Sequence, residues 1–245
     1  MVGTGFKQKI ERRSQENNSR LVFALDLVRK ELNKSDFVEK CLNILEKTEL
    51  YIAGVKIGYP LVLDTDLEII SKISEVNNVP IIADFKIADV PHISKQIAKL
   101  AFKAGADAVI SHGFTGDDSL GAIIEACEEE NKGVLVVSNM SHPGGEMFIQ
   151  PMSEKILNLA KEAKATGIIG PATRPEQVEK LRKKAGEELL ILTPGIGAQG
   201  GRPGDAIKNG ADYEIVGRAI YQSESPGKSA ENIRDTINET LKEED

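Results

Sequence analysis

The sequence predicts an α/β protein with the architecture of a (β/α)8 TIM barrel, and three observations lead to this prediction. Eight short apolar runs alternate with segments of helical periodicity along the 245 residues. The runs are continuously apolar, as is typical of parallel strands that are covered on both faces. Alternation alone allows a doubly wound sheet, but eight units in roughly the 250 residues typical of a barrel favour the closed form.

The expected elements follow one another without a linker or a shift in composition. Strands are expected at 21–25, 51–56, a third beginning at 81, then 108–110, 133–137, 167–169, 189–192 and 213–216. Helices are expected at 35–47, after Asp64 or Thr65, and at 91–103, 119–129, 153–163, 175–184, 203–209 and 229–242. Residues 1–20 carry scattered charge and are expected to form an N-terminal arm or short helix. Residues 21–245 are therefore expected to form a single barrel domain.

Composition and charge exclude several classes of function. The formal net charge of −7 argues against nucleic acid or an anionic membrane as the main partner. No apolar run approaches the ~18 residues of a membrane span, so we expect a cytoplasmic protein. Cys41 and Cys127 fall in helical patterns without metal or redox spacing, and the three histidines form no ligand cluster. We therefore expect no metal and no cofactor.

A motif of charged residues interrupts the third apolar run. Because a strand repeats every two residues, Asp84 and Lys86 are expected on the same face. Asp89 follows where a helix should start, and Lys56 adds a second cation from the preceding strand. In the simplest interpretation Asp84 and Lys86 form a structural ion pair and Asp89 caps the helix, and a lone Asp-x-Lys would favour this interpretation. Four charges around one strand end favour a functional site, because buried charges are costly unless they are used.

Polar side chains also follow most of the other strands. In a barrel, all strand carboxyl ends meet at one face, which is where such enzymes place their sites. Any one of these residues could be a cap or a solvated side chain, but their shared position favours one site. The residues are Asp26, Lys56, Asp84, Lys86, Ser141, Gln199 and Arg218.

The last two strand–helix loops suggest a phosphate site. Glycines at 195–201 allow backbone N–H groups to approach an anion, and Gly217-Arg218 offers amides beside a fixed cation. Gly195-x-Gly197-x-x-Gly200 also matches a dinucleotide fingerprint, with Glu214 as its acidic residue. We reject this alternative because the motif comes late in the chain, Pro203 interrupts the following segment, and Glu214 falls in a predicted strand.

Five motifs lie in order between Leu21 and about Tyr221: Val55-Lys56-Ile57-Gly58, Asp84-Phe85-Lys86-Ile87-Ala88-Asp89, Met140-Ser141-His142-Pro143-Gly144, Pro194-Gly195-Ile196-Gly197-Ala198-Gln199-Gly200-Gly201 and Gly217-Arg218. In order and spacing they resemble the orotidine 5′-phosphate decarboxylase family, in its compact archaeal type. The resemblance implies a homodimer of barrels that converts orotidine 5′-monophosphate to UMP and carbon dioxide without a cofactor.

The resemblance also implies a role for each matching residue. Lys56, Asp84, Lys86 and Asp89 would form an alternating charge network, with Lys86 as proton donor and Asp89 reaching the neighbouring subunit's site. Val90 stands where isoleucine is more usual, and Ser94 where threonine is commoner. Contacts to the substrate would come from Asp26, Lys56 and Ser94 to the ribose, Ser141 to the pyrimidine, and Gln199, Gly217 and Arg218 to the phosphate.

Two other functions stay open at this point. A metal-dependent sugar-phosphate decarboxylase or aldolase of the same superfamily would keep the Asp-x-Lys-x-x-Asp motif and the phosphate loops. The Ser141-His142-Pro143-Gly144 loop and Gln199 favour a pyrimidine nucleotide instead. A non-catalytic barrel that binds a phosphate ligand is the other alternative, which the intact set of charges disfavours.

Overall fold

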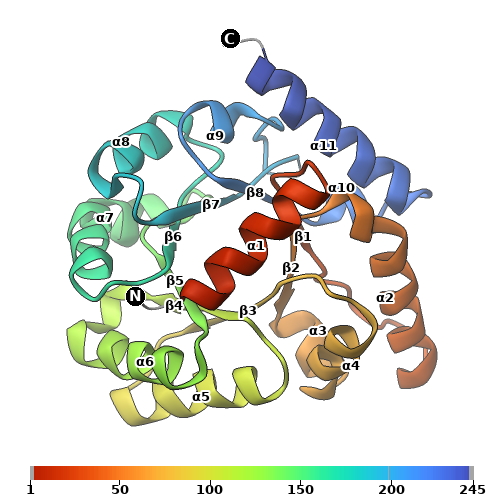
Figure 1. Ribbon diagram of the computed structural model, residues 1–245, viewed down its shortest axis with the longest axis horizontal. Coiled ribbons are helices and arrows are strands. Elements are labelled where there is room, and N and C mark those ends of the chain that lie inside the picture. Colours follow the sequence, from red (N-terminus) through yellow and green to blue (C-terminus); the bar gives the residue numbers. More distant parts are fainter. Residues whose placement is uncertain (1–2, 198, 243–245) are drawn as a thin grey trace.

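The computed structural model describes residues 3–197 and 199–242, and in these residues eight parallel strands close into a barrel (Figure 1). Each strand pairs with its neighbours in the sequence, and β1 pairs with β8. The predicted (β/α)8 fold is thus confirmed. The strands are β1 Leu21–Ala24, β2 Gly54–Gly58, β3 Ile81–Ile87, β4 Ala108–His112, β5 Gly133–Val137, β6 Gly167–Ile169, β7 Leu190–Pro194 and β8 Tyr213–Val216.

Helices follow every strand and form a ring outside the barrel (Figure 1). Short 3-10 helices, η1 (Glu49–Tyr51) and η2 (Gly113–Thr115), add to the connections. The α-helices are α1 Thr4–Glu16, α2 Lys34–Thr48, α3 Tyr59–Asp64, α4 Glu68–Val76, α5 Pro91–Lys103, α6 Asp117–Glu130, α7 Gly145–Glu162, α8 Pro175–Ala185, α9 Asp205–Lys208, α10 Arg218–Tyr221 and α11 Pro226–Lys242.

The strands are buried on both sides, which explains their continuous apolar runs. Outward side chains such as Phe23, Val55 and Ile191 pack against the helices in a large cluster. Inward side chains such as Val22 and Leu192 fill the barrel in a second, smaller cluster. The interior is therefore packed by side chains, and a cavity can open only at an end of the barrel.

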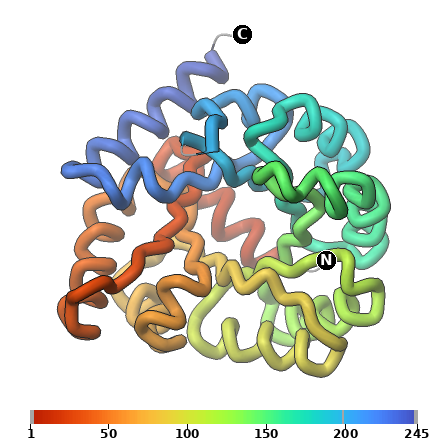
Figure 2. Tube along the Cα trace, turned by 180° about the vertical axis from the view of Figure 1, so that it is seen from behind, coloured from red at the N-terminus to blue at the C-terminus, as the bar shows by residue number. Residues whose placement is uncertain are grey.

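Helix α1 covers one end of the barrel. Figure 1 shows it lying across the strands, and Figure 2 shows it behind the barrel when the molecule is viewed from the opposite side. Phe6 and Ile10 are buried and join the interior cluster. Lys9 forms a salt bridge of 2.7 Å with Asp107, whose carboxylate also accepts the Ile81 N–H. Of the two expected forms, an arm or a short helix, residues 4–16 form a helix, and this helix closes the end opposite to the strand carboxyl ends instead of lying apart from the barrel.

The structure departs from the sequence prediction in some elements. The second strand begins at Gly54, because residues 49–51 form a 3-10 turn, and α3 follows that strand unexpectedly. Helix α7 begins at Gly145, eight residues before the predicted start at 153. Proline normally argues against a helix interior, yet Pro151 lies inside α7. The helix continues because a proline removes one hydrogen bond without removing the others.

Candidate active site

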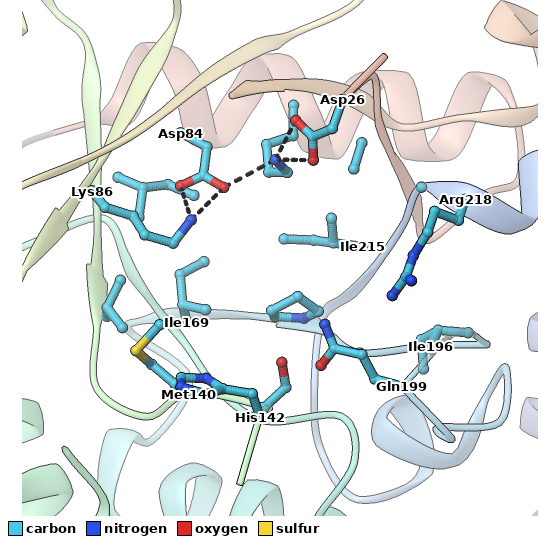
Figure 3. Close-up of a pocket in the computed structure, with 18 of the residues that line it drawn as sticks. Asp26, Asp84, Lys86, Met140, His142, Ile169, Ile196, Gln199, Ile215 and Arg218 are labelled. Atoms are coloured by element: carbon cyan, nitrogen blue, oxygen red, sulfur yellow. Dashed lines mark hydrogen bonds and ion pairs between the residues drawn. The ribbon is translucent and has the colours of Figure 1, made fainter. Parts of the chain in front are cut away.

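Four charged side chains form a row of alternating sign across β1, β2 and β3. The Lys56 Nζ lies 2.9 Å from Asp26 Oδ2 and 3.0 Å from Asp84 Oδ2. The Lys86 Nζ lies 2.8 Å from Asp84 Oδ1 and 2.9 Å from Oδ2. Figure 3 shows this row along one side of a cavity. Every charge in the row therefore touches only charges of opposite sign within it.

The centre of the row is buried and its ends are open. Lys56 is 6% exposed and Asp84 is 7% exposed, whereas the Lys86 side chain is 42% exposed. Burial lowers the pKa of Lys56, but the Asp84 and Asp26 carboxylates outweigh this effect and raise the pKa overall. Burial likewise raises the pKa of Asp84, but Lys56 and Lys86 outweigh it and lower the pKa. Both groups are thus held in their charged forms.

A bulge in β3 positions Lys86. Ala83 pairs with Val109 and Ile87 pairs with Ser111, so three residues of β3 lie opposite the single residue Ile110 of β4. Lys86 has a φ of 40°, a left-handed conformation that is uncommon for a lysine. The predicted convergence of Asp84 and Lys86 is present. Simple strand alternation is not its cause, however, because the bulge interrupts the strand between them.

The cavity beside the row has a volume of about 400 Å³. Figure 3 shows Asp84 and Lys86 on one side, with Gln199 and Arg218 across the cavity from them. Ser141 and Gly217 also line the cavity. Apolar side chains line its floor beside the charges; they are Ala24, Ile110, Val137, Ile169 and Ile215. The cavity therefore offers a charged end, an apolar floor and a separate cationic end.

The glycine-rich loop after β7 folds back on itself. Gly195, Gly197 and Gly200 have φ values of 119°, 72° and 98°, which a residue with a side chain adopts only with strain. The Gly197 N–H donates to the Gly201 carbonyl, and the Gly201 N–H donates to the Gly195 carbonyl. Ala198, part of the motif noted in the sequence, lies outside the described residues. The fold of this loop brings Gln199 to the rim of the cavity.

The loop that carries Ser141 is held from outside by residues that follow β6. The Thr173 hydroxyl donates to the Ser141 carbonyl at 2.8 Å. The Arg174 guanidinium donates to Asn139 Oδ1 at 3.3 Å and also to the Met140 carbonyl. Sequence reasoning missed Thr173 and Arg174, because a threonine and an arginine before a helix carry no signal of a distant loop contact.

Asp89 and Ser94 do not line the cavity of their own chain. Asp89 is exposed at the turn before α5, and its carboxylate accepts the Val90 N–H at 2.7 Å. Ser94 is fully buried, and its hydroxyl lies between the Asp89 carbonyl and Ser119. The predicted ribose contact of Ser94 is corrected here, because a fully buried hydroxyl cannot reach a ligand.

Known proteins resemble this chain over nearly its whole length. The sequence pattern of the orotidine 5′-phosphate decarboxylase / HUMPS family matches residues 19–233. The chain belongs to this family. An orotidine 5′-phosphate decarboxylase from Methanosarcina acetivorans is 47% identical over 229 residues, which cover 94% of this chain and 99% of the relative. A relative of the same name from Thermococcus kodakarensis is 45% identical over 91% of this chain.

Solved structures of the decarboxylase family agree with the fold. The enzyme from Methanocaldococcus jannaschii, crystallised with the inhibitor BMP, is 41% identical, with a TM-score of 0.82 over 90% of this chain and 99% of that structure. A putative family member from Toxoplasma gondii has a TM-score of 0.85 at 21% identity, which supports the fold alone. In this chain the row of charges at β1 to β3 lies at the carboxyl end of the strands, where enzymes with a (β/α)8 barrel have their active sites.

Glu214 is a fully buried carboxyl group on β8 whose backbone contacts the sequence did not predict. Its carboxylate accepts the Gly204 N–H at 2.9 Å and the Ala206 N–H at 3.1 Å, at the end of the loop after β7. Burial raises its pKa to about 7, and the backbone hydrogen bonds offset part of this rise. Glu214 therefore anchors the end of the glycine-rich loop through its backbone, which agrees with the rejection of the dinucleotide fingerprint.

Two further features concern residues 3–197 and 199–242, which the structure describes. No group of three or more histidine, cysteine, aspartate or glutamate side chains in these residues could hold a metal ion. None of the helices in the same residues is both long and apolar enough to cross a membrane.

Proposed function

We propose that this chain decarboxylates orotidine 5′-monophosphate to UMP and carbon dioxide without a cofactor, as a step in pyrimidine biosynthesis. One observation carries the proposal: the Asp26–Lys56–Asp84–Lys86 row lies across a single cavity from Gln199 and Arg218. This arrangement suits a substrate with a reacting carboxylate at one end and a phosphate at the other. The family membership and the named decarboxylase relatives support it.

The reaction poses a particular electrostatic problem. Loss of carbon dioxide from C6 of the pyrimidine leaves an electron pair in the plane of the ring, where the π-system cannot accept it. Most decarboxylases solve this problem with an electron sink such as pyridoxal phosphate or thiamine diphosphate. Without a sink, the stabilisation has to come from charges that are already in place when the substrate binds.

Lys86 is the group suited to meet the developing carbanion. Of the two cations in the row, Lys86 is the more exposed to the cavity, and Asp84 holds its ammonium in place. Two unit charges ~4 Å apart interact by roughly 4 kcal/mol at an effective dielectric constant of about 20. The ammonium can then transfer a proton to C6 and complete UMP.

Asp84 has a second role in this proposal. Its carboxylate is buried and charged beside the place where the substrate carboxylate must lie. Two carboxylates in contact repel each other, and the repulsion disappears when carbon dioxide leaves as a neutral molecule. Lys56 keeps Asp84 ionised at this position. Lys56 and Asp26 both line the cavity and are proposed to bond the ribose.

The phosphate is proposed to bind at the opposite end of the cavity. Arg218 offers a permanent charge and two parallel donors, and Gln199 offers an amide from the glycine-rich loop. Ser141 also lines the cavity and is proposed to contact the pyrimidine. Binding energy from the phosphate can close the loop at 195–201 and offset the desolvation of the charged end.

We also propose that two copies form a cytoplasmic homodimer in which Asp89 completes the partner's site. Asp89 is acidic and exposed, and it is not among the residues that line the cavity beside Lys86. Val90 beside it and Phe114 after β4 are large apolar side chains that are exposed at the same barrel end. Such an apolar surface is typical of a region that a partner covers.

The proposal is tested by following the ultraviolet absorbance change of orotidine 5′-monophosphate in buffer treated with EDTA. We expect full turnover to UMP. Loss of activity on chelation would favour the metal-dependent alternative. Tight UMP binding without turnover would favour the binding-only barrel.

A further inference from the structure

Three buried serines converge on the backbone of the segment that carries Lys86 and Asp89. The Ser111 hydroxyl, on β4, donates to the Ile87 carbonyl at 3.0 Å. The hydroxyls of Ser94 on α5 and Ser119 on α6 both donate to the Asp89 carbonyl, at 2.9 Å and 2.7 Å. The three side chains are at most 2% exposed. We call Ser94, Ser111 and Ser119 the serine clamp.

The segment held by this clamp has little regular backbone support. The pairing of β3 with β4 shifts register between Ala83 and Ile87, and Lys86 adopts its left-handed φ of 40° inside that shift. Helix α5 begins only at Pro91, so residues 88–90 belong to neither a strand nor a helix. A residue in a sparsely populated conformation persists only where its surroundings fix it.

The serine clamp bonds two carbonyls of this segment, those of Ile87 and Asp89, which both follow Lys86 in the chain. Ile87 is the last residue of β3, and Asp89 is the charged residue of the turn. Ser94 and Ser119 also lie 3.0 Å from each other. Because each hydroxyl has one hydrogen, a serine that donates to the other serine does not donate to the Asp89 carbonyl at the same time, and the carbonyl keeps the other hydroxyl as its donor. The donors come from three different elements, which fixes the segment against both β4 and the α5–α6 pair.

We propose that Ser94, Ser111 and Ser119 are positioning residues for decarboxylation: they fix the backbone that sets where the Lys86 ammonium and the Asp89 carboxylate point. This inference rests on the proposed function of Lys86 and Asp89. It assigns Ser94 a role in holding the turn that carries Asp89. The clamp touches no group that would bind the phosphate, since Gln199 and Arg218 lie on other loops.

The two halves of the clamp have separable consequences. Ser111 holds the bulge, so its loss displaces Lys86 in the same subunit. Ser94 and Ser119 hold the Asp89 turn, so their loss displaces Asp89. A misplacement of about 1 Å at a reacting group can lower a rate by roughly 100-fold. Because the Asp89 carbonyl keeps one hydroxyl in each single variant, Ser94→Ala and Ser119→Ala are expected to be milder than Ser111→Ala.

The test measures kcat and KM for orotidine 5′-monophosphate, together with UMP affinity, in Ser111→Ala, Ser94→Ala and Ser119→Ala. We expect kcat to fall by roughly 10- to 100-fold in Ser111→Ala, with KM and UMP affinity within about twofold of wild type. Ser111→Thr keeps a hydroxyl at the same position and should recover most of kcat.

Ser19→Ala is the matched control. Its hydroxyl is equally buried and donates to a backbone carbonyl, that of Tyr51, at 2.7 Å, but at the opposite end of the barrel. We expect Ser19→Ala to lower Tm without changing kcat. All variants are assayed well below their Tm, so that a loss of folded protein is not read as a loss of rate.

An unchanged kcat in Ser111→Ala would overturn the inference, as would a fall no larger than that in Ser19→Ala, or a rise in KM at constant kcat. If Ser111→Ala does not fold, a reduced kcat in Ser94→Ala and Ser119→Ala supports the clamp and an unchanged kcat refutes it. Failure of the proposed function is a different result, because wild-type protein would then show no turnover.

Discussion

At the scale of single residues, the two ends of the cavity are built for different tasks. Asp84 and Lys56 are buried and bonded to each other, so their positions are set before any ligand binds. Arg218 is exposed at the rim of the cavity, where the proposed phosphate would bind. Preorganised charge suits the chemical step, whereas an exposed cation suits capture of the substrate.

Replacement of Arg218 is therefore expected to affect binding first. Arg218→Ala removes charge-assisted hydrogen bonds to the phosphate and should raise KM by about 100-fold. Steady-state kinetics and UMP titration measure this effect. Arg202→Ala removes an exposed arginine from the neighbouring segment and serves as the control. An unchanged KM in Arg218→Ala would contradict the phosphate assignment.

Replacement of Lys56 is expected to affect stability as well as activity. Lys56→Met leaves Asp84 buried beside Lys86 alone and should lower the free energy of unfolding by roughly 3 kcal/mol at pH 7. Lys72→Met, which breaks a pair with Glu68 on an exposed helix face, should lower it by less than about 1 kcal/mol. Urea unfolding of both variants measures the difference. An equal loss of unfolding free energy in the two variants would show that Lys56 is not needed to keep Asp84 stable in its buried position.

At the scale of elements, the loops after β7 and β8 owe their shape to groups outside the cavity. Gly204 ends the glycine-rich loop with a φ of 93° between Glu214 on β8 and Thr240 on α11. A Cβ at Gly204 would lie 2.3 Å from the Thr240 hydroxyl, so only glycine fits. The buried carboxylate of Glu214 is thus the fixed point from which this loop extends to Gln199.

Glu214 also makes stability depend on pH. Its pKa rises from 4.5 to about 7 on folding, through burial first and then the nearby Asp205. Between these values the folded protein binds a proton that the unfolded chain has lost, so this stabilisation is complete below pH 4.5 and is lost as pH rises through 7. The advantage of wild type over Glu214→Gln should thus shrink by roughly 2–3 kcal/mol from pH 5 to 8.

Thermal or urea unfolding of both proteins across this range provides the measurement. Glu231→Gln, at an exposed pair with Lys228, is the control and should show no such trend. A difference between wild type and Glu214→Gln that stays constant with pH would contradict the raised pKa.

The elements also show how far the sequence could predict the structure. The number of strands could be predicted from the apolar runs, because a parallel strand that is buried on both faces is apolar at every position and does not alternate with polar residues. A shared site was predicted because Asp26, Lys56 and Asp84 follow or end strands that meet at one barrel end. The predicted charge network named Asp89 as its fourth member, whereas in this chain the row ends in Asp26. The bulge at Lys86 was not predictable, since its φ of 40° depends on pairing with β4 rather than on local residue types.

Ser94 is a residue whose role the sequence could not decide. A serine in the first turns of a helix beside a charged motif is equally compatible with a ligand contact and with a buried backbone contact. Only the packing of α5 against α6 places its hydroxyl on the Asp89 carbonyl and Ser119. The start of α7 was missed for a different reason, because the proline at 151 argued against a helix at a point where the structure has one.

At the scale of the whole molecule, the two ends of the barrel are used differently. Helix α1 seals one end with Phe6 and Ile10, and the other end carries the charged row and the cavity. The exposed apolar side chains near Asp89 lie at that second end. A second copy that covers them would bring its own Asp89 toward the neighbouring site, which the proposed homodimer requires.

Mixed dimers test this arrangement. Lys86→Ala and Asp89→Asn chains are each inactive if both residues are needed, but a hybrid dimer with shared sites contains one site with Lys86 and Asp89 intact. Unfolding and refolding an equal mixture should recover about one quarter of wild-type activity if dimers form at random. No recovery, with hybrids present by mass spectrometry, would show that each subunit's site is self-contained.

The central claim is that fixed charge at Lys86, held by Asp84, makes decarboxylation possible without an electron sink. The most direct measurement is the turnover of orotidine 5′-monophosphate by Lys86→Ala, compared with its affinity for UMP. Loss of both the stabilising charge and the proton donor should lower kcat by at least about 10⁴-fold, while UMP affinity changes by less than about tenfold. Turnover within about tenfold of wild type would contradict the claim.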